Sequence, residues 1–73
     1  MDGKAVKAIR EEKRMSQTEF AKAIGVSQQT IQAVETGRRS VSERIRYRIS
    51  ALFDADETIE IVRRARLVDR LIL

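Results

Sequence analysis

"QTEFAKAIGVSQQTIQAVET", residues 17–36, contains two short amphipathic segments that are separated only by Gly-Val-Ser at residues 25–27. Glycine adopts positive φ readily and serine caps a following helix, so this connection predicts a sharp corner between two helices. Ala21 is small enough for the helices to cross closely, and Ile31 and Val34 can close an apolar core beneath the corner. The combination predicts a helix-turn-helix.

Capping signals and apolar periodicity extend the helical prediction to the rest of the chain. In "RIRYRI" (44–49) the alternation resembles a strand, but the apolar positions continue at i, i+4, i+7 and i+8, which favours a helix. They are Ile45, Ile49, Leu52 and Phe53. Three pairs match the S-x-x-E capping box or a looser form of it: Ser16 with Glu19, Ser40 with Glu43, and Asp54 with Glu57. We therefore expect an all-α fold with helices at 4–13, 17–24, 28–35, 43–53 and 57–71.

Length and composition narrow the class of protein. Seventy-three residues suffice for one domain, which we expect to comprise a core at 4–54 and a C-terminal helix within 55–73. The chain has no Cys and no His, and it shows neither a paired-carboxylate nor a glycine-rich phosphate motif. We therefore expect no enzyme activity, no metal site and no cofactor. No apolar run reaches the roughly 18 residues of a membrane span, so the expected location is the cytoplasm.

The charge is distributed unevenly along the chain. Residues 1–53 hold 11 Lys and Arg against 6 Asp and Glu, whereas residues 54–73 hold 4 against 5. A basic body with a near-neutral tail indicates a face that binds a polyanion and a separate role for the tail. A basic surface that only keeps the protein in solution is an equally open interpretation of charge alone.

Three of the four glutamines lie on the predicted helix 28–35. At 100° per residue, the side that carries Ile31 and Val34 faces the core, so the glutamines face outward or flank the first turn. A carboxamide pairs a donor with an acceptor, which matches adenine N7 and N6 in the major groove, and a small apolar group can contact a thymine methyl. A merely solvated polar face is the alternative. The predicted base contacts are Gln28, Gln29, Gln32, Ala33 and Thr30.

Phosphate anchors are expected on both sides of this helix. The start of helix 17–24 offers free backbone amides and the positive end of the helix dipole, which attract an anion. The segment directly after helix 28–35 carries exposed cations that can reach the flanking DNA backbone. The predicted phosphate contacts are Ser16, Gln17, Ser27, Arg38, Arg39 and Ser40.

The stretch "MSQTEFAKAIGVSQQTIQAVETGRRSVS" (15–42) resembles the Cro/cI-type (Xre-like) helix-turn-helix domain of phage repressors and many bacterial regulators. The resemblance covers residues 4–54 and implies a five-helix, λ-repressor-like fold that binds a palindromic operator in double-stranded DNA as a dimer. It also implies that Arg10 and Glu35 form a structural ion pair. Ala33 departs from the family, which often has glutamine there, so we expect a different operator but the same mode of binding.

The last predicted helix is apolar around about 240° of its circumference at 100° per residue, whereas one packing face needs little more than about 100°. The excess suggests burial against a second subunit through Ile61, Ala65, Val68, Leu71 and Ile72. Alternatively, further sequence of a longer protein covers this surface.

The leading interpretation is therefore a dimeric, sequence-specific transcriptional regulator, encoded by a bacterium or a phage. It would be a repressor, a Cro-like protein or a restriction-modification controller. One alternative is an antitoxin or anti-factor whose apolar C-terminal helix binds a protein partner. Another is a DNA-binding protein without sequence preference.

Overall fold

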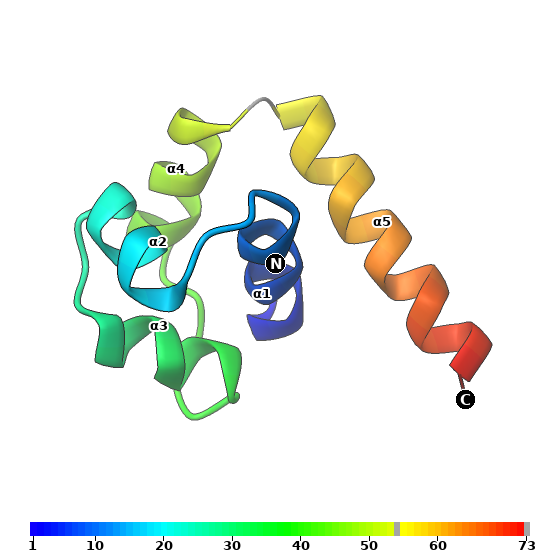
Figure 1. The fold of residues 1–73 in the computed structure, drawn as a ribbon, viewed down its shortest axis with the longest axis horizontal. Coiled ribbons are helices and arrows are strands. Elements are labelled where there is room, and N and C mark those ends of the chain that lie inside the picture. The colour runs from blue at the N-terminus through cyan, green and yellow to red at the C-terminus, as the bar shows by residue number, and fades with distance from the viewer. Residues whose placement is uncertain (54, 73) are drawn as a thin grey trace.

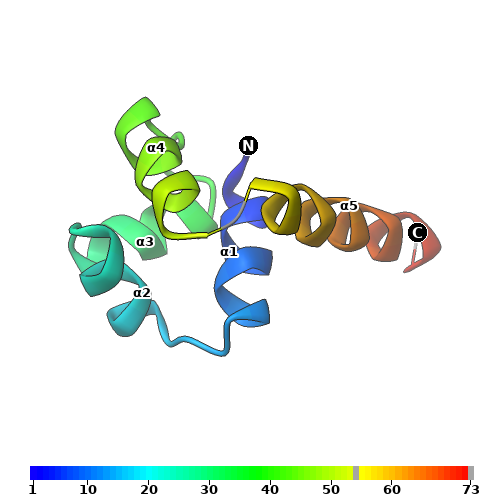
Figure 2. The same ribbon diagram turned by 90° about the horizontal axis from the view of Figure 1, so that it is seen from above.

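The computed structural model describes residues 1–53 and 55–72, with side chains described for residues 1–53 and 59–68. This part of the chain forms five helices and no strand, which confirms the all-α prediction. Figures 1 and 2 both place α1 between the α2–α3 pair on one side and α5 on the other. The helices are α1 (Gly3–Glu12), α2 (Gln17–Ile24), α3 (Gln28–Glu35), α4 (Glu43–Leu52) and α5 (Ala55–Ile72).

Serine caps begin three of the helices. Ser16 forms the complete capping box with Glu19, and the Ser27 hydroxyl accepts from the Thr30 amide at 3.1 Å, as predicted. The predicted cap of α4 by Ser40 is wrong. Ser42 directly precedes the helix in extended conformation, and its hydroxyl accepts from the backbone amide of Ile45 at 3.1 Å. The predicted pairing of Asp54 with Glu57 lies outside the described residues.

The corner between α2 and α3 has the conformation that its sequence requires. Gly25 is left-handed, with φ at +75°, and the Val26 amide closes the turn by donating to the Ala21 carbonyl at 2.9 Å. Ala21 itself is 2% exposed at the helix crossing. The corner thus fixes how α3 leaves α2, and with it the direction of the predicted recognition helix.

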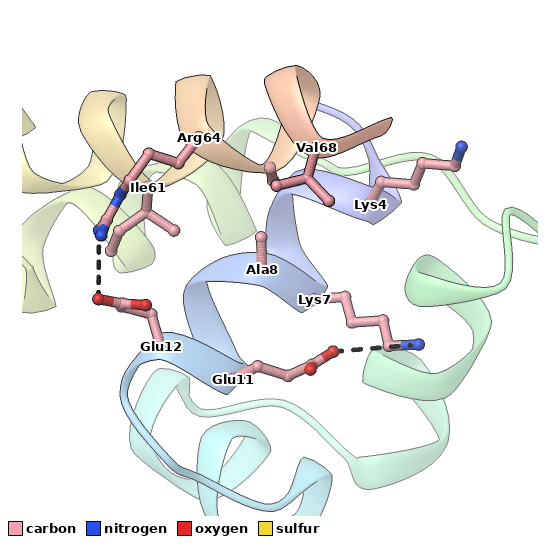
Figure 3. Close-up of a pocket in the computed structure, with 9 residues that line it drawn as sticks. Lys4, Lys7, Ala8, Glu11, Glu12, Ile61, Arg64 and Val68 are labelled. Atoms are coloured by element: carbon pink, nitrogen blue, oxygen red, sulfur yellow. Dashed lines mark hydrogen bonds and ion pairs between the residues drawn. The ribbon is translucent and has the colours of Figure 1, made fainter. Parts of the chain in front are cut away.

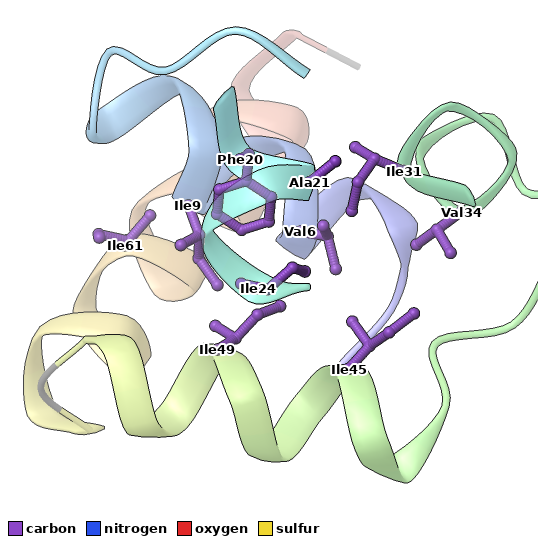
Figure 4. Packing of buried hydrophobic residues seen from close by; sticks show 10 residues of the cluster. All are labelled: Val6, Ile9, Phe20, Ala21, Ile24, Ile31, Val34, Ile45, Ile49 and Ile61. Atoms are coloured by element: carbon purple, nitrogen blue, oxygen red, sulfur yellow. The ribbon is translucent and has the colours of Figure 1, made fainter. Parts of the chain in front are cut away.

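The core positions predicted at the helix-turn-helix corner, Ala21, Ile31 and Val34, are buried, and with residues of α1, α4 and α5 they form one cluster (Figure 4). Leu52 is the exception to the pattern in α4, because its side chain is 46% exposed. The chain leaves the helix at Phe53, whose ring stacks on that of Phe20 with centroids 6.1 Å apart. The cluster comprises Val6, Ile9, Phe20, Ala21, Ile24, Ile31, Val34, Ile45, Ile49 and Ile61.

Ile61 joins this core from α5 and is only 3% exposed. Packing within its own domain therefore already buries this side chain, which we expected at a dimer interface from the sequence. Arg64, one turn further along, forms an ion pair of 3.2 Å with Glu12 of α1. These contacts fasten the first half of α5 to α1. No helix in the described part of the chain is long and apolar enough to cross a membrane.

The N-terminus of α1 packs directly on the C-terminal end of α3, a contact that the sequence did not reveal. A methyl group on Gly3 would overlap the carbonyl oxygen of Val34, which is backbone and cannot rotate away. Glycine at this position allows the two helices to approach closely. Gly3 therefore holds the end of the predicted recognition helix against the domain.

Replacing Gly3 with alanine is expected to lower the free energy of unfolding by about 2 kcal/mol because of the overlap. Alanine in a helix normally adds stability relative to glycine, so the sign of the change, measured by denaturant unfolding, tests the contact. Gly37→Ala is the control: nothing lies within 4 Å of a methyl group there, and only its φ of +79° costs about 1 kcal/mol. A stabilised Gly3→Ala variant would contradict the close approach.

Candidate nucleic-acid interface

A chain of hydrogen bonds runs from the domain core to the first residue of α3. The Gln17 Nε2 donates to Glu35 Oε1 at 3.2 Å, and Gln28 Nε2 donates to Gln17 Oε1 at 2.8 Å. The three residues come from the start of α2, the start of α3 and the end of α3. The structure therefore joins Gln28, a predicted base contact, to Gln17, a predicted phosphate contact.

The chemistry of these side chains determines which group donates in each of these hydrogen bonds. An ionised carboxylate only accepts hydrogen bonds, so Gln17 must turn its NH2 toward Glu35. That leaves the Gln17 oxygen facing Gln28, which must turn its own NH2 inward. Gln28 keeps its oxygen and its second N–H for an outside partner. An acceptor beside a donor is the pattern that pairs with adenine in the major groove.

Arg10 holds Glu35, the innermost residue of this series of hydrogen bonds. Its Nε and Nη2 donate to the two oxygens of Glu35 at 2.8 and 3.0 Å, and its Nη1 donates to the Met15 carbonyl at 2.9 Å. The side chains are only 14% and 3% exposed for Arg10 and Glu35, respectively. The hydrogen bonds to Glu35 raise the pKa of Arg10 above its usual value, so the guanidinium stays charged. The structure thus brings together the two residues of the expected ion pair.

The remaining candidate base contacts lie on the outer side of α3 to different degrees. Gln29 and Gln32 are exposed, whereas Thr30 and Ala33 are partly buried. The Thr30 hydroxyl lies 2.8 Å from the Ser27 hydroxyl, so both are occupied within the cap. Thr30 therefore presents mainly its methyl group, and Ser27 acts first as a helix cap.

The start of α2 offers backbone donors for an anion. Ser16 and Glu19 use their amides within the capping box, at 2.9 and 3.0 Å. Within the described residues, the amides of Gln17 and Thr18 have no hydrogen-bond partner. The Ser16 backbone amide, followed by the Ser16 hydroxyl, lowers the pKa of the exposed Glu19 carboxyl. The phosphate contact expected at Gln17 would come from its backbone, because its side chain is engaged with Gln28 and Glu35.

The segment that follows the C-terminal end of α3 carries two exposed arginines. The amides of Arg38 and Arg39 both donate to the Ala33 carbonyl, at 2.9 and 3.2 Å, and so fold the segment back onto the helix end. Both residues and Ser40 are exposed. Neither guanidinium has an ion-pair partner among the side chains that the structure describes. They are free to meet a DNA backbone beside α3.

The candidate dimer residues on α5 differ in how far they are buried. Ile61 is buried, Ala65 is partly buried and Val68 is 51% exposed. The side chains of Leu71 and Ile72 lie outside the described residues. No group of carboxylates suited to a metal ion occurs in the described part of the chain.

The helix-turn-helix family model matches residues 6–58. The chain belongs to this family. It is also 41% identical over 70 residues to a protein of Pyrococcus horikoshii whose name places it among the HTH-type transcriptional regulatory proteins. The match covers 94% of this chain but 22% of that relative, so the chain spans about a fifth of the relative's length. No solved structure matches the chain. The family predicted from the sequence is confirmed.

Proposed function

We propose that this helix-turn-helix chain is a DNA-binding transcriptional regulator that reads a palindromic operator as a dimer through α3. The observation that carries the proposal is the fixed amide of Gln28. Its outward acceptor and donor match an adenine edge, and the inner hydrogen bond to Gln17 holds it in place before DNA arrives. Gln29 and Gln32 are the further readers, and Ala33 and the Thr30 methyl are candidates for thymine contacts.

The candidate phosphate contacts before and after α3 support this proposal. The free amides are at the start of α2, the helix before α3, and the exposed Arg38 and Arg39 follow the C-terminal end of α3. Contacts to the DNA backbone position a recognition helix, while base edges specify the sequence. Together with Ser16 and Ser40, these groups would hold α3 in the groove.

The surface proposed for the dimer is a groove between α1 and α5, which we call the α1–α5 groove, of about 580 Å³ (Figure 3). Its walls carry both signs of charge, with Lys7 beside Glu11 at 4.0 Å and Arg64 beside Glu12 at 3.2 Å. A two-fold interface places each surface against its own copy, so mixed charges can pair across it. Val68, 51% exposed, adds apolar area at the rim.

The resemblance to Cro/cI-type domains supports a repressor, a Cro-like protein or a restriction-modification controller. Such a regulator would work in the cytoplasm, where its operator DNA lies. Half-sites about one helical turn apart, 34–36 Å, are expected for a dimer of this motif.

Selection of binding sites from random double-stranded DNA tests the proposal, together with light scattering. We expect an enriched palindrome and the mass of a dimer. Val68→Glu should give a folded monomer that binds the operator at least tenfold more weakly, because it places a charge in the apolar rim. Equal affinity for all duplexes would contradict sequence-specific reading, and an unchanged dimer mass in Val68→Glu would contradict this interface.

A further inference from the structure

A second groove lies on the other flank of α5, and its lining is completed by Met1 and by Arg46 of α4. We call it the arginine groove. Its volume is about 710 Å³, and it shares no lining residue with the α1–α5 groove. The α5 residues that line it recur at i, i+3, i+4, i+7 and i+8 and therefore form one helical face. The apolar members are Met1, Ile59, Val62 and Leu67, and the arginines are Arg63 and Arg66, with Arg46 added from α4.

The charge on this groove has one sign. Arg46 is the only one of its three arginines with an ion-pair partner among the described side chains. That partner is Glu43, at 3.4 Å and 92% exposed. Arg63 and Arg66 have none in that part of the chain, and no carboxylate lines the groove. The α1–α5 groove differs, because its Arg64 already pairs with Glu12.

Large apolar side chains lie exposed between these arginines. Ile59 is 56% exposed and Leu67 is 55% exposed. Contiguous apolar surface with a polar rim is typical of an interaction site. From Ile59 to Leu67 the groove follows α5 for about 12 Å, or roughly two turns of a helix. An amphipathic helix laid in a groove places its apolar residues at this spacing.

We propose that the arginine groove binds an amphipathic helix of another protein that carries carboxylates along its flanks. Its apolar residues would cover Ile59 and Leu67, and its carboxylates would accept paired hydrogen bonds from Arg63 and Arg66. A second copy of this chain is disfavoured, because two-fold pairing would bring arginine against arginine. DNA would satisfy the arginines but leave the apolar floor exposed to water.

This proposal sharpens the sequence-based alternative of a protein partner on the C-terminal helix, and it is independent of DNA reading. The test is an NMR titration of the full chain with a stapled helical peptide of about four turns. The peptide carries leucine at i, i+3, i+4 and i+7 and glutamate on both flanks. We expect saturable shifts of the backbone amides around residues 59–67. A second peptide with lysine in place of glutamate should not bind.

Variants test whether the acidic peptide binds in the arginine groove. The double variant Arg63→Gln, Arg66→Gln should raise the Kd of the acidic peptide about tenfold, and so should Leu67→Ser. Arg64→Gln, the neighbouring arginine on the other flank, should change it less than about twofold. The charge-reversed variant Arg63→Glu, Arg66→Glu should bind the lysine peptide instead.

Several outcomes would overturn the proposal. Absence of shifts with the acidic peptide, or equal binding of both peptides, would contradict recognition of a carboxylate-bearing helix. A monomeric mass for Leu67→Ser would assign the groove to self-association. Weaker operator binding by the Arg63→Gln, Arg66→Gln variant, without an effect on peptide binding, would assign it to DNA.

Discussion

Replacing Glu35 with alanine is expected to lower the free energy of unfolding by about 3 kcal/mol, because it leaves the guanidinium of Arg10 charged, largely buried and unpaired. For a domain of this size that corresponds to a fall in Tm of more than about 10 °C. The carboxylate accepts three hydrogen bonds, two from Arg10 and one from Gln17. Thermal unfolding followed by circular dichroism measures the loss directly.

The control is Glu12→Ala, which removes another ion pair that α1 makes. Its contact with Arg64 is 3.2 Å long but 47% and 55% exposed, so water already solvates both charges. We expect a loss of less than about 1 kcal/mol. Similar melting temperatures for the Glu35→Ala variant and the original chain would show that the buried pair does not stabilise the fold.

Replacing Gln28 with alanine is expected to weaken binding to the selected operator about 10- to 100-fold, since a bidentate contact to adenine is lost. Selectivity should disappear at one symmetric base pair of each half-site and remain elsewhere. Thermal stability should change little. Parallel binding-site selections with the original chain and the variant measure both the affinity and the position of the lost preference.

Two further variants distinguish a residue that contacts a base from a residue that only holds the Gln28 amide in position. Gln17→Ala removes no base contact in our proposal, yet it should weaken selectivity at the same base pair about fivefold, because the Gln28 amide loses its inner partner. Gln32→Ala should affect a different base pair. If the Gln28→Ala and original chains select the same operator, the amide at this position does not read a base.

The sequence predicted the helix-turn-helix corner well because local chemistry determines it. Gly25 has no side chain to oppose positive φ, Ser27 caps the next helix, and Ala21 permits the crossing. The apolar spacing also identified Ile31, Val34 and Ile49 as core residues. These features depend on neighbours within about two helical turns, so periodicity and capping rules capture them.

Features that depend on distant contacts were predicted less well. Ile61 and Val68 lie on similar sides of α5 by periodicity, but only the position of α1 decides that Ile61 is buried and Val68 exposed. Ser40 and Ser42 both precede α4, and the path of the loop selects Ser42 as the cap. The link from Gln17 to Gln28 requires the corner to close before the two amides can meet.

The anchored amide also constrains how operators of such a regulator can diverge. Gln28 donates a hydrogen bond to Gln17, which itself donates to the buried Glu35, so a new side chain at 28 leaves the Gln17 oxygen without its partner. The side chains of Gln29 and Gln32 make no hydrogen bond to another side chain within the described part of the protein. We expect new binding specificities to arise by substitution at 29, 32 and 33, around one base pair that stays constant.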